Sequence, residues 1–179
     1  MRRRALLPTL LMTFVVVLAV SGSPALAASS DTVNITVTIS QAIGVEITET
    51  SYNFGTLTTG TTATSASSLT VTNTGSGANE NYSLNCSNTA NWTAGTSPGT
   101  NIFVLRAQFN STAPTTFDTT DILSTSPVLA DATHFSGNET GINVPYGAVR
   151  HLWLRLQTPT SSSSTAQQTI VLTITGSIS

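Results

Sequence analysis

The chain contains no lysine, and charged side chains of either sign are scarce. Only 8% of its 179 residues are charged, against about 25% in a typical soluble domain. All six basic residues are arginine, and three of them are residues 2–4. The rest of the chain has three arginines against eight acidic residues, a net charge of 3 − 8 = −5. Nucleic-acid binding is excluded, because such a chain has no basic surface to neutralise phosphates.

Cysteine and histidine are almost as rare, which limits the available chemistry. Cys86 is the single cysteine, so no disulfide can form within the chain. It shares one face of a predicted strand with Tyr82 and Leu84, and this position predicts a buried thiol. His134 and His151 are the only histidines, and no serine stands in a G-x-S-x-G elbow. The sequence therefore predicts a protein that is not an enzyme.

Long apolar runs are absent apart from one short run near the N-terminus. Residues 2–4 are followed by an apolar stretch over about residues 10–20 and then by small residues ending at Ala25-Leu26-Ala27. This pattern is typical of a secretory signal peptide over residues 1–27. The apolar run is shorter than the ~20 residues that a membrane span needs. We expect a mature chain of residues 28–179, secreted or at the cell surface, without a transmembrane segment.

The mature chain is rich in serine, threonine and apolar residues at alternate positions. Val33, Ile35, Val37 and Ile39 are separated by polar residues, and Thr169–Ile178 alternates in the same way. A period of two is typical of half-buried strands. Some eight such segments, separated by turn residues, predict an all-β fold, namely a single antiparallel immunoglobulin-like β-sandwich.

Two parts of the expected domain lack this alternation. Residues 111–147 contain three prolines and scattered acidic residues, so we expect an irregular excursion with one short strand. Residues 158–168 form a Ser/Thr-rich loop. We expect this loop to join the last two strands of the chain as a hairpin.

Residues 51–77 contain a Phe-Gly pair, a later glycine and a strand that ends in Thr-Asn-x-Gly. The residues that carry this pattern are Phe54, Gly55, Gly60, Val71, Thr72, Asn73 and Gly75. The pattern resembles immunoglobulin-like modules of bacterial surface proteins, which implies a core position for Phe54. Residues 153–156, Trp-Leu-Arg-Leu, are also similar to the Gram-positive WxL cell-wall-binding domains, although Arg155 stands where that motif has leucine.

Acidic residues concentrate in the irregular excursion and are the candidate metal ligands. Asp118, Asp121, Asp131 and Glu139 offer the oxygen atoms that Ca²⁺ prefers. Calcium commonly stiffens secreted modules, so a calcium site in this region is one hypothesis. No other cofactor is expected.

The first functional hypothesis is a structural protein of the cell surface, such as a subunit of an extracellular filament, matrix or envelope layer. Val33, Ile35, Val37 and Ile39 would form a donor strand that adds to the sheet edge of another copy or of another envelope component. The same residues could instead be the first strand of their own sheet.

The second hypothesis is a module that binds carbohydrate or a cell-wall polymer. Its contact residues would be Trp153, His151 and Arg155, which share the outer face of one predicted strand. A tryptophan ring on such a face can stack on a sugar, and the long loop of residues 111–147 could add further contacts.

Overall fold

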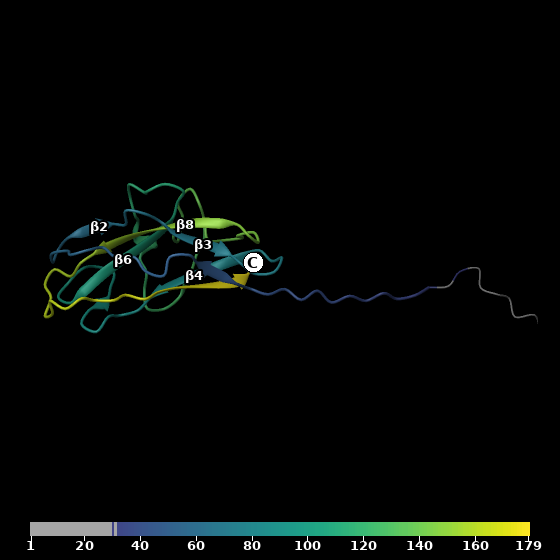
Figure 1. Cartoon of the computed structure of the whole chain (residues 1–179), viewed down its shortest axis with the longest axis horizontal. Coiled ribbons are helices and arrows are strands. Elements are labelled where there is room, and N and C mark those ends of the chain that lie inside the picture. The colour runs from purple at the N-terminus through teal and green to yellow at the C-terminus, as the bar shows by residue number, and fades with distance from the viewer. Residues whose placement is uncertain (1–29, 31) are drawn as a thin grey trace, which may run out of the picture. The chain divides into compact units, whose positions relative to one another are not determined.

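The computed structural model describes residue 30 and residues 32–179 of the chain (Figure 1). The predicted signal peptide lies outside the described residues. The chain divides into two units, residues 1–38 and residues 39–179. Every strand of the described chain belongs to the second unit, whereas we expected the sandwich domain to begin at residue 28.

The second unit is built almost entirely from β-strands. Its elements in chain order are β1 (Val45–Ile47), β2 (Thr62–Thr64), β3 (Leu69–Asn73), β4 (Glu80–Cys86), β5 (Thr93–Ala94), β6 (Ile102–Phe109), the 3-10 helix η1 (Thr119–Asp121), β7 (Val128–Leu129), β8 (Val149–Gln157) and β9 (Leu172–Ile178). Within the described residues, no helix has the length and apolar character needed to cross a bilayer. The predicted all-β class is confirmed.

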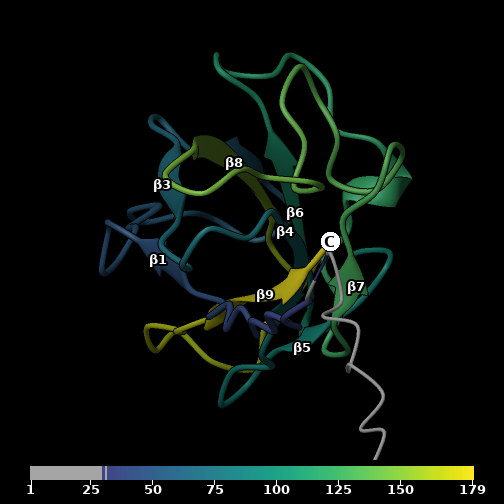
Figure 2. The ribbon, with the colours of Figure 1, turned by 90° about the vertical axis from the view of Figure 1, so that its right-hand side faces the viewer.

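The strands form two sheets that face each other as the layers of a β-sandwich. The larger sheet has the order β1-β3-β8-β6-β5, and β2 lies beside β3 along the same edge of β8. The smaller sheet has the order β7-β4-β9. All pairings are antiparallel except that of β5 with β6. Figure 2 shows β9 in the layer opposite β8.

The core lies between the two sheets, and the alternating pattern determines which side chains enter it. In β8, Leu152, Leu154 and Leu156 are buried, while the residues between them face outward. In β4, Tyr82 and Leu84 face the core and are fully buried. Because side chains of a strand alternate between its two faces, each strand contributes an apolar row to one layer of the core.

The irregular excursion over residues 111–147 is an integral part of this core. It supplies β7, the one short strand that we expected there, and β7 pairs with β4. It also buries Leu123, Phe135 and Val144 in the main hydrophobic cluster. The excursion therefore stabilises the sandwich, although it has little regular secondary structure.

The expected hairpin of the last two strands is wrong. β8 lies in the larger sheet and β9 in the smaller sheet, where β9 pairs with β4 along its whole length. Both edges of β8 are already occupied, by β6 on one side and by β2 and β3 on the other, so no edge is left for β9. The Ser/Thr-rich loop over residues 158–168 consequently carries the chain from one sheet to the other.

Residues 33–39, called the arm below, are not a strand of either sheet. The apolar side chains of Val33, Ile35, Val37 and Ile39 have exposed fractions of 79–87%. The hypothesis that these residues form the first strand of their own sheet is therefore wrong. The arm sequence alternates as a strand does, yet within the described chain it lacks the neighbouring strand that would bury its apolar side.

The body of the domain begins with residues 42–44, just after the arm. The carbonyl oxygen of Ala42 accepts the N–H of Ser76 at 2.7 Å, and that of Gly44 accepts the N–H of Thr74 at 2.8 Å. The N–H of Gly44 donates to Oε1 of the buried Glu80 at 2.7 Å. These bonds attach the root of the arm to the turn between β3 and β4.

The only thiol of the chain is expected to be unreactive in the folded protein. Cys86 is fully buried, and burial raises the pKa of its thiol to about 11. At pH 8 the reactive thiolate is therefore scarce as well as inaccessible. We expect a chromogenic disulfide reagent to leave the native protein unlabelled and to react with one thiol per chain in denaturant. Rapid labelling of the native protein would contradict this burial.

Candidate functional site

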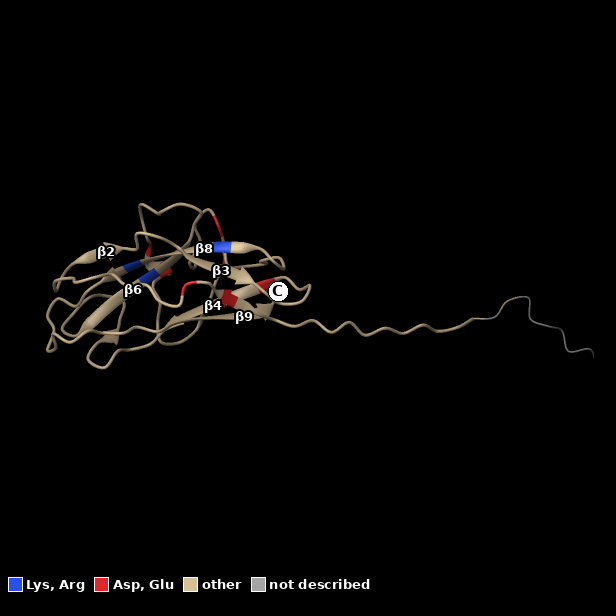
Figure 3. Cartoon of the chain, in the orientation of Figure 1, with Lys and Arg blue, Asp and Glu red and all other residues tan. Residues whose placement is uncertain are grey.

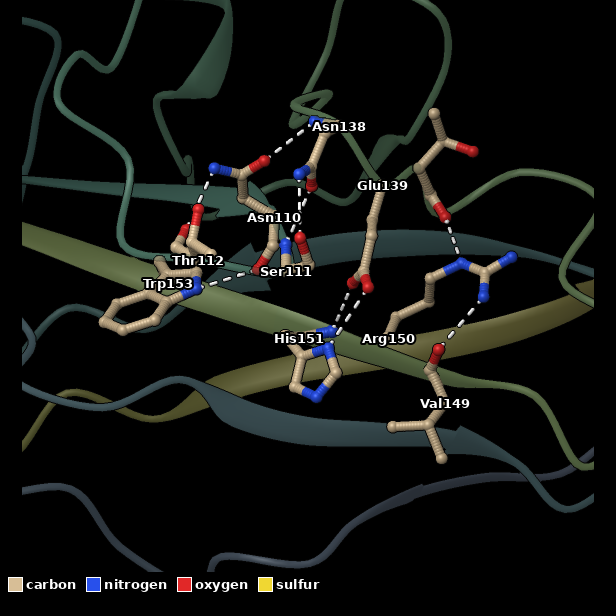
Figure 4. Close-up of polar contacts among 10 residues, drawn as sticks. Asn110, Ser111, Thr112, Asn138, Glu139, Val149, Arg150, His151 and Trp153 are labelled. Carbon is tan, nitrogen blue, oxygen red and sulfur yellow. Dashed lines mark hydrogen bonds and ion pairs between the residues drawn. The ribbon is translucent and has the colours of Figure 1, made fainter.

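Two of the predicted ligand-binding residues on the outer face of β8 have bonded partners, one in Asn110 just after β6 and the other in the irregular excursion. The indole N–H of Trp153 donates to the carbonyl oxygen of Asn110 at 2.8 Å (Figure 4). Glu139 accepts the backbone N–H of His151 at 2.7 Å, and its other oxygen lies 3.1 Å from Nδ1 of the same histidine. His151 thus holds the excursion against the sheet, and Trp153 holds the residue that precedes it.

The third predicted contact residue, Arg155, faces the same outer surface. It lies opposite Arg106 in the register of β6 and β8, and its guanidinium carbon is 5.9 Å from the centre of the Phe117 ring. In Figure 3 the blue ribbon segments that mark arginine positions lie on β6 and β8. Burial, followed by the nearby charge of Arg155, lowers the pKa of Arg106. Arg155 and Phe117 thus form one cation–aromatic contact between β8 and the excursion.

The four predicted calcium ligands are not brought together. Asp121 accepts the N–H of Asp118 at 2.8 Å beside η1, and burial raises the pKa of Asp121. Asp131 accepts the backbone and ring N–H groups of His134, while Glu139 binds β8 as described above. Within the described residues, no three His, Cys, Asp or Glu side chains gather as a metal site requires. The carboxylates of Asp121, Asp131 and Glu139 instead accept hydrogen bonds from other groups of the protein.

A groove that the sequence analysis did not anticipate opens on the other side of the domain, between the two sheets. Its floor contains Leu69 of β3 with Leu154 and Leu156 of β8. One wall is lined by residues 164–172, which lead into β9, and the other by residues 49–57 and Thr59. The groove has a volume of about 1150 Å³. This exceeds the range of about 300–1,000 Å³ that is typical of small-molecule pockets.

The core is incompletely covered along this groove. Leu69, Leu105, Leu154, Leu156 and Ile174 keep exposed fractions of 4–8%, whereas most of the core is at 0%. Four of these five line the groove, and the fifth lies on β9 two residues beyond it. The residual exposure therefore marks one unfilled side of the sandwich.

Aromatic side chains flank the groove without closing it. Tyr52 and Phe54 pack edge to face with ring centres 4.9 Å apart, and both remain half-buried at its margin. The core position that the resemblance implied for Phe54 is thus a position at the edge of the core. The indole N–H of Trp92 donates to Ser162 of the Ser/Thr-rich loop at 2.9 Å. Glu49 is the only charged residue among those that line the groove.

The strand beside the groove has a free edge. β9 is the last strand of the smaller sheet, and its other neighbour is β4. The N–H of Ser179 donates to Asn79, and the carbonyl of Val171 accepts from Ser87, so the odd-numbered residues of this strand bond to β4. In an antiparallel ladder the backbone groups of alternate residues point to opposite edges. The even-numbered residues 172–178 therefore direct their N–H and C=O groups outward, where no hydrogen bond reaches them within the described chain.

One signal for this edge was present in the sequence. Thr169–Ile178 alternates as regularly as the arm, and a regular strand at a sheet edge offers an unpaired ladder. The groove itself could not be foreseen, because it depends on which strands occupy the two sheets.

No family model, curated protein or solved structure matches this chain.

Proposed function

We propose that this chain is an exported structural subunit that assembles with further copies of itself through a strand added to a sheet edge. The observation that carries the proposal is the arm, in which four apolar side chains at alternate positions are almost fully exposed. A free sheet edge and an exposed strand-like segment in the same chain are the two halves of such a contact. Because each copy has both, the contact repeats head to tail and forms a fibre.

The physical cost of leaving the arm uncovered supports this proposal. Fully burying a Val or Ile side chain stabilises a protein by about 1.5–3 kcal/mol. The arm leaves four such side chains in water. Natural proteins usually protect strand-forming segments and sheet edges with charges or proline, because exposed ones promote association. Residues 33–39 contain neither, which fits a segment that is covered by a neighbour.

We also propose that the sandwich is immunoglobulin-like, and that within the described residues the place of the last strand of that fold is empty. The constant-type immunoglobulin sandwich has strands A-B-E-D in one sheet and C-F-G in the other. The path β1-β3-β8-β6 corresponds to A-B-E-D, and the pair β4-β9 corresponds to C-F. The vacant place beside β9 is that of strand G. A domain of this kind would be completed by a strand from outside its own sandwich.

Export is part of the same proposal. An Arg-rich start, a short apolar run and Ala25-Leu26-Ala27 are typical of a cleaved signal peptide. Cleavage after Ala27 would leave the arm near the new N-terminus of the mature chain. The assembly would therefore form outside the cytoplasm, at the cell surface or in the medium.

The polymer-binding hypothesis is the less favoured one. The indole N–H of Trp153 already bonds to Asn110, and the imidazole of His151 bonds to Glu139 of the excursion. These bonds use polar groups of both side chains that would otherwise be available to a sugar hydroxyl.

The test compares the mature chain, residues 28–179, with a variant that lacks residues 28–39. We expect the mature chain to form fibres visible by electron microscopy and large species in light scattering. The shortened variant is expected to remain a monomer, because it keeps the sheet edge but has no strand to donate. Equal behaviour of the two proteins, as monomers or as fibres, would contradict the proposal.

A matched pair of variants tests whether assembly requires the apolar side chains of the arm or only the presence of the arm. Replacement of Val33, Ile35 and Val37 by serine is expected to abolish assembly. Replacement of Asn34, Thr36 and Thr38 by serine changes three residues of the same segment and is expected to preserve it.

A further inference from the structure

We infer that the groove beside β9 is the acceptor site for the arm of a second copy, which lies antiparallel to β9. This inference rests on the proposed function and specifies the site, the occupant and the direction of the contact. It requires three properties of the two surfaces, namely matching chemistry, a free backbone ladder, and an attachment point that favours another copy.

The chemistry of the groove matches the arm. Leucines 69, 154 and 156 form an apolar floor, and Ile170 and Leu172 add to the wall beside β9. Residues 32–45, which include the arm, contain no charged side chain. The one charged residue of the groove, Glu49, is occupied by the N–H and hydroxyl groups of Thr70 at 2.6 and 2.9 Å. An uncharged strand with one apolar side can therefore enter without leaving an ion unpaired.

The edge of β9 supplies the backbone bonds. The outward N–H and C=O groups of its even-numbered residues repeat every second residue, as a new antiparallel neighbour requires. β9 has seven residues, and the arm over 33–39 is long enough to pair with most of them. The apolar side chains of the arm would then point between the sheets while its Asn and Thr side chains face solvent.

The attachment of the arm decides its direction. Its root at Gly44 binds Glu80, and Glu80 lies opposite Ile178 in the register of β4 and β9. The arm of each copy therefore leaves near the C-terminal end of β9, whereas the groove reaches residues 167–172 at the other end. If the incoming arm runs antiparallel to β9, its own domain lies beyond residue 167, away from the exit of the resident arm. A parallel strand would place the incoming domain and the exit of the resident arm at the same end of β9.

The same attachment favours a second copy over the chain's own arm. An antiparallel strand sets Ile39 beside Ile170, at the far end of β9 from residues 42–44. Three residues from Ile39 to Ala42 span at most about 11 Å, whereas the nine residues from Ile170 to Ser179 extend about 30 Å along the strand. The chain's own arm cannot bridge that distance while its root remains bonded to the turn after β3.

One register satisfies the pattern of apolar residues on both strands. It sets Ile35 opposite Ile174, Val37 opposite Leu172, and Ile39 opposite Ile170. The side chains of Ile170, Leu172 and Ile174 are directed toward the core, and the two of these residues that belong to β9 also have outward backbone groups. A shift by one residue would turn every apolar side chain of the arm toward solvent.

The first test uses a synthetic peptide of residues 32–40 and the chain of residues 40–179, which contains the compact unit with all the strands. We expect saturable binding by isothermal calorimetry. The peptide with Ile35→Asp and Val37→Asp should bind at least about 100-fold more weakly, because both side chains lose their burial. The control peptide with Thr36→Asp should change affinity by no more than about threefold. No binding, or equal loss with both peptides, would overturn the inference.

The second test measures the direction of the bound arm relative to β9 in the assembled full-length protein. Asn34→Cys with Thr175→Cys, and Thr38→Cys with Val171→Cys, are expected to form disulfides between copies. The exchanged combinations, residue 34 with 171 and residue 38 with 175, should not cross-link, since the antiparallel register separates them by about 13 Å. Cross-links in the exchanged pairs, or in none, would refute the acceptor site while assembly itself would still support the proposed function. Native Cys86 is buried and does not interfere.

Discussion

A chain whose arm is moved to its own C-terminus is expected to be monomeric and much more resistant to heat than the chain without an arm. The variant consists of residues 40–179, a flexible Gly/Ser linker and a copy of residues 32–40. Because the linker starts just after β9, it returns the arm along β9 in the antiparallel direction. Four apolar side chains then become buried, each worth about 2 kcal/mol, and ordering of the strand offsets part of this gain.

We expect a net gain of about 3 kcal/mol, which raises the melting temperature by roughly 6–12 °C for a domain of this size. Calorimetric melting checks the stability, and light scattering checks the monomeric state. The matched control carries the same linker and arm with Ile35→Asn and Val37→Asn in the appended copy. If the control melts at the same temperature as the variant, the appended strand does not fill the sandwich.

Phe135→Ala is expected to cause a large loss of stability, although residue 135 lies outside every strand. Phe135 lies in the irregular excursion, yet its ring is fully buried in the main cluster, and its carbonyl accepts the N–H of Phe109 at 2.9 Å. Truncating a buried phenylalanine costs about 3–5 kcal/mol, from lost burial and from the cavity that remains. The φ of 58° at residue 135 is as unfavourable for alanine as for phenylalanine. The change in unfolding free energy therefore measures the loss of the ring and not a change in backbone strain.

Phe117→Ala is the control, because Phe117 belongs to the same excursion but is only half-buried and faces Arg155. The free energy of unfolding of the Phe117→Ala variant should fall by about 1 kcal/mol. Denaturant unfolding of both variants measures the difference. A small effect at Phe135 would show that the excursion is a surface loop and not part of the core.

The strands with strict alternation could be predicted from the sequence, since their side chains report burial directly. The leucines of β8 at 152, 154 and 156 are buried as their parity indicates, and Tyr82 and Leu84 of β4 likewise. The short strand within residues 111–147 was also foreseeable. These features depend on local pattern alone.

Features that depend on strand pairing were not foreseeable. The assignment of β8 and β9 to different sheets follows from β8 having no free edge, which involves β2, β3 and β6 from distant parts of the chain. The groove depends on the same pairings. The contact between His151 and Glu139 likewise arises only when the excursion folds back over the sheet.

The bonds at the root of the arm determine how the domain would carry a mechanical load. Tension applied through Ile39 reaches Ala42 and Gly44, which are held by the turn after β3 and by Glu80 at the start of β4. β3 belongs to one sheet and β4 to the other. A force applied to the arm is therefore transmitted to both sheets at residues 42–44. The force must therefore break bonds to both layers together before it can peel a single strand away.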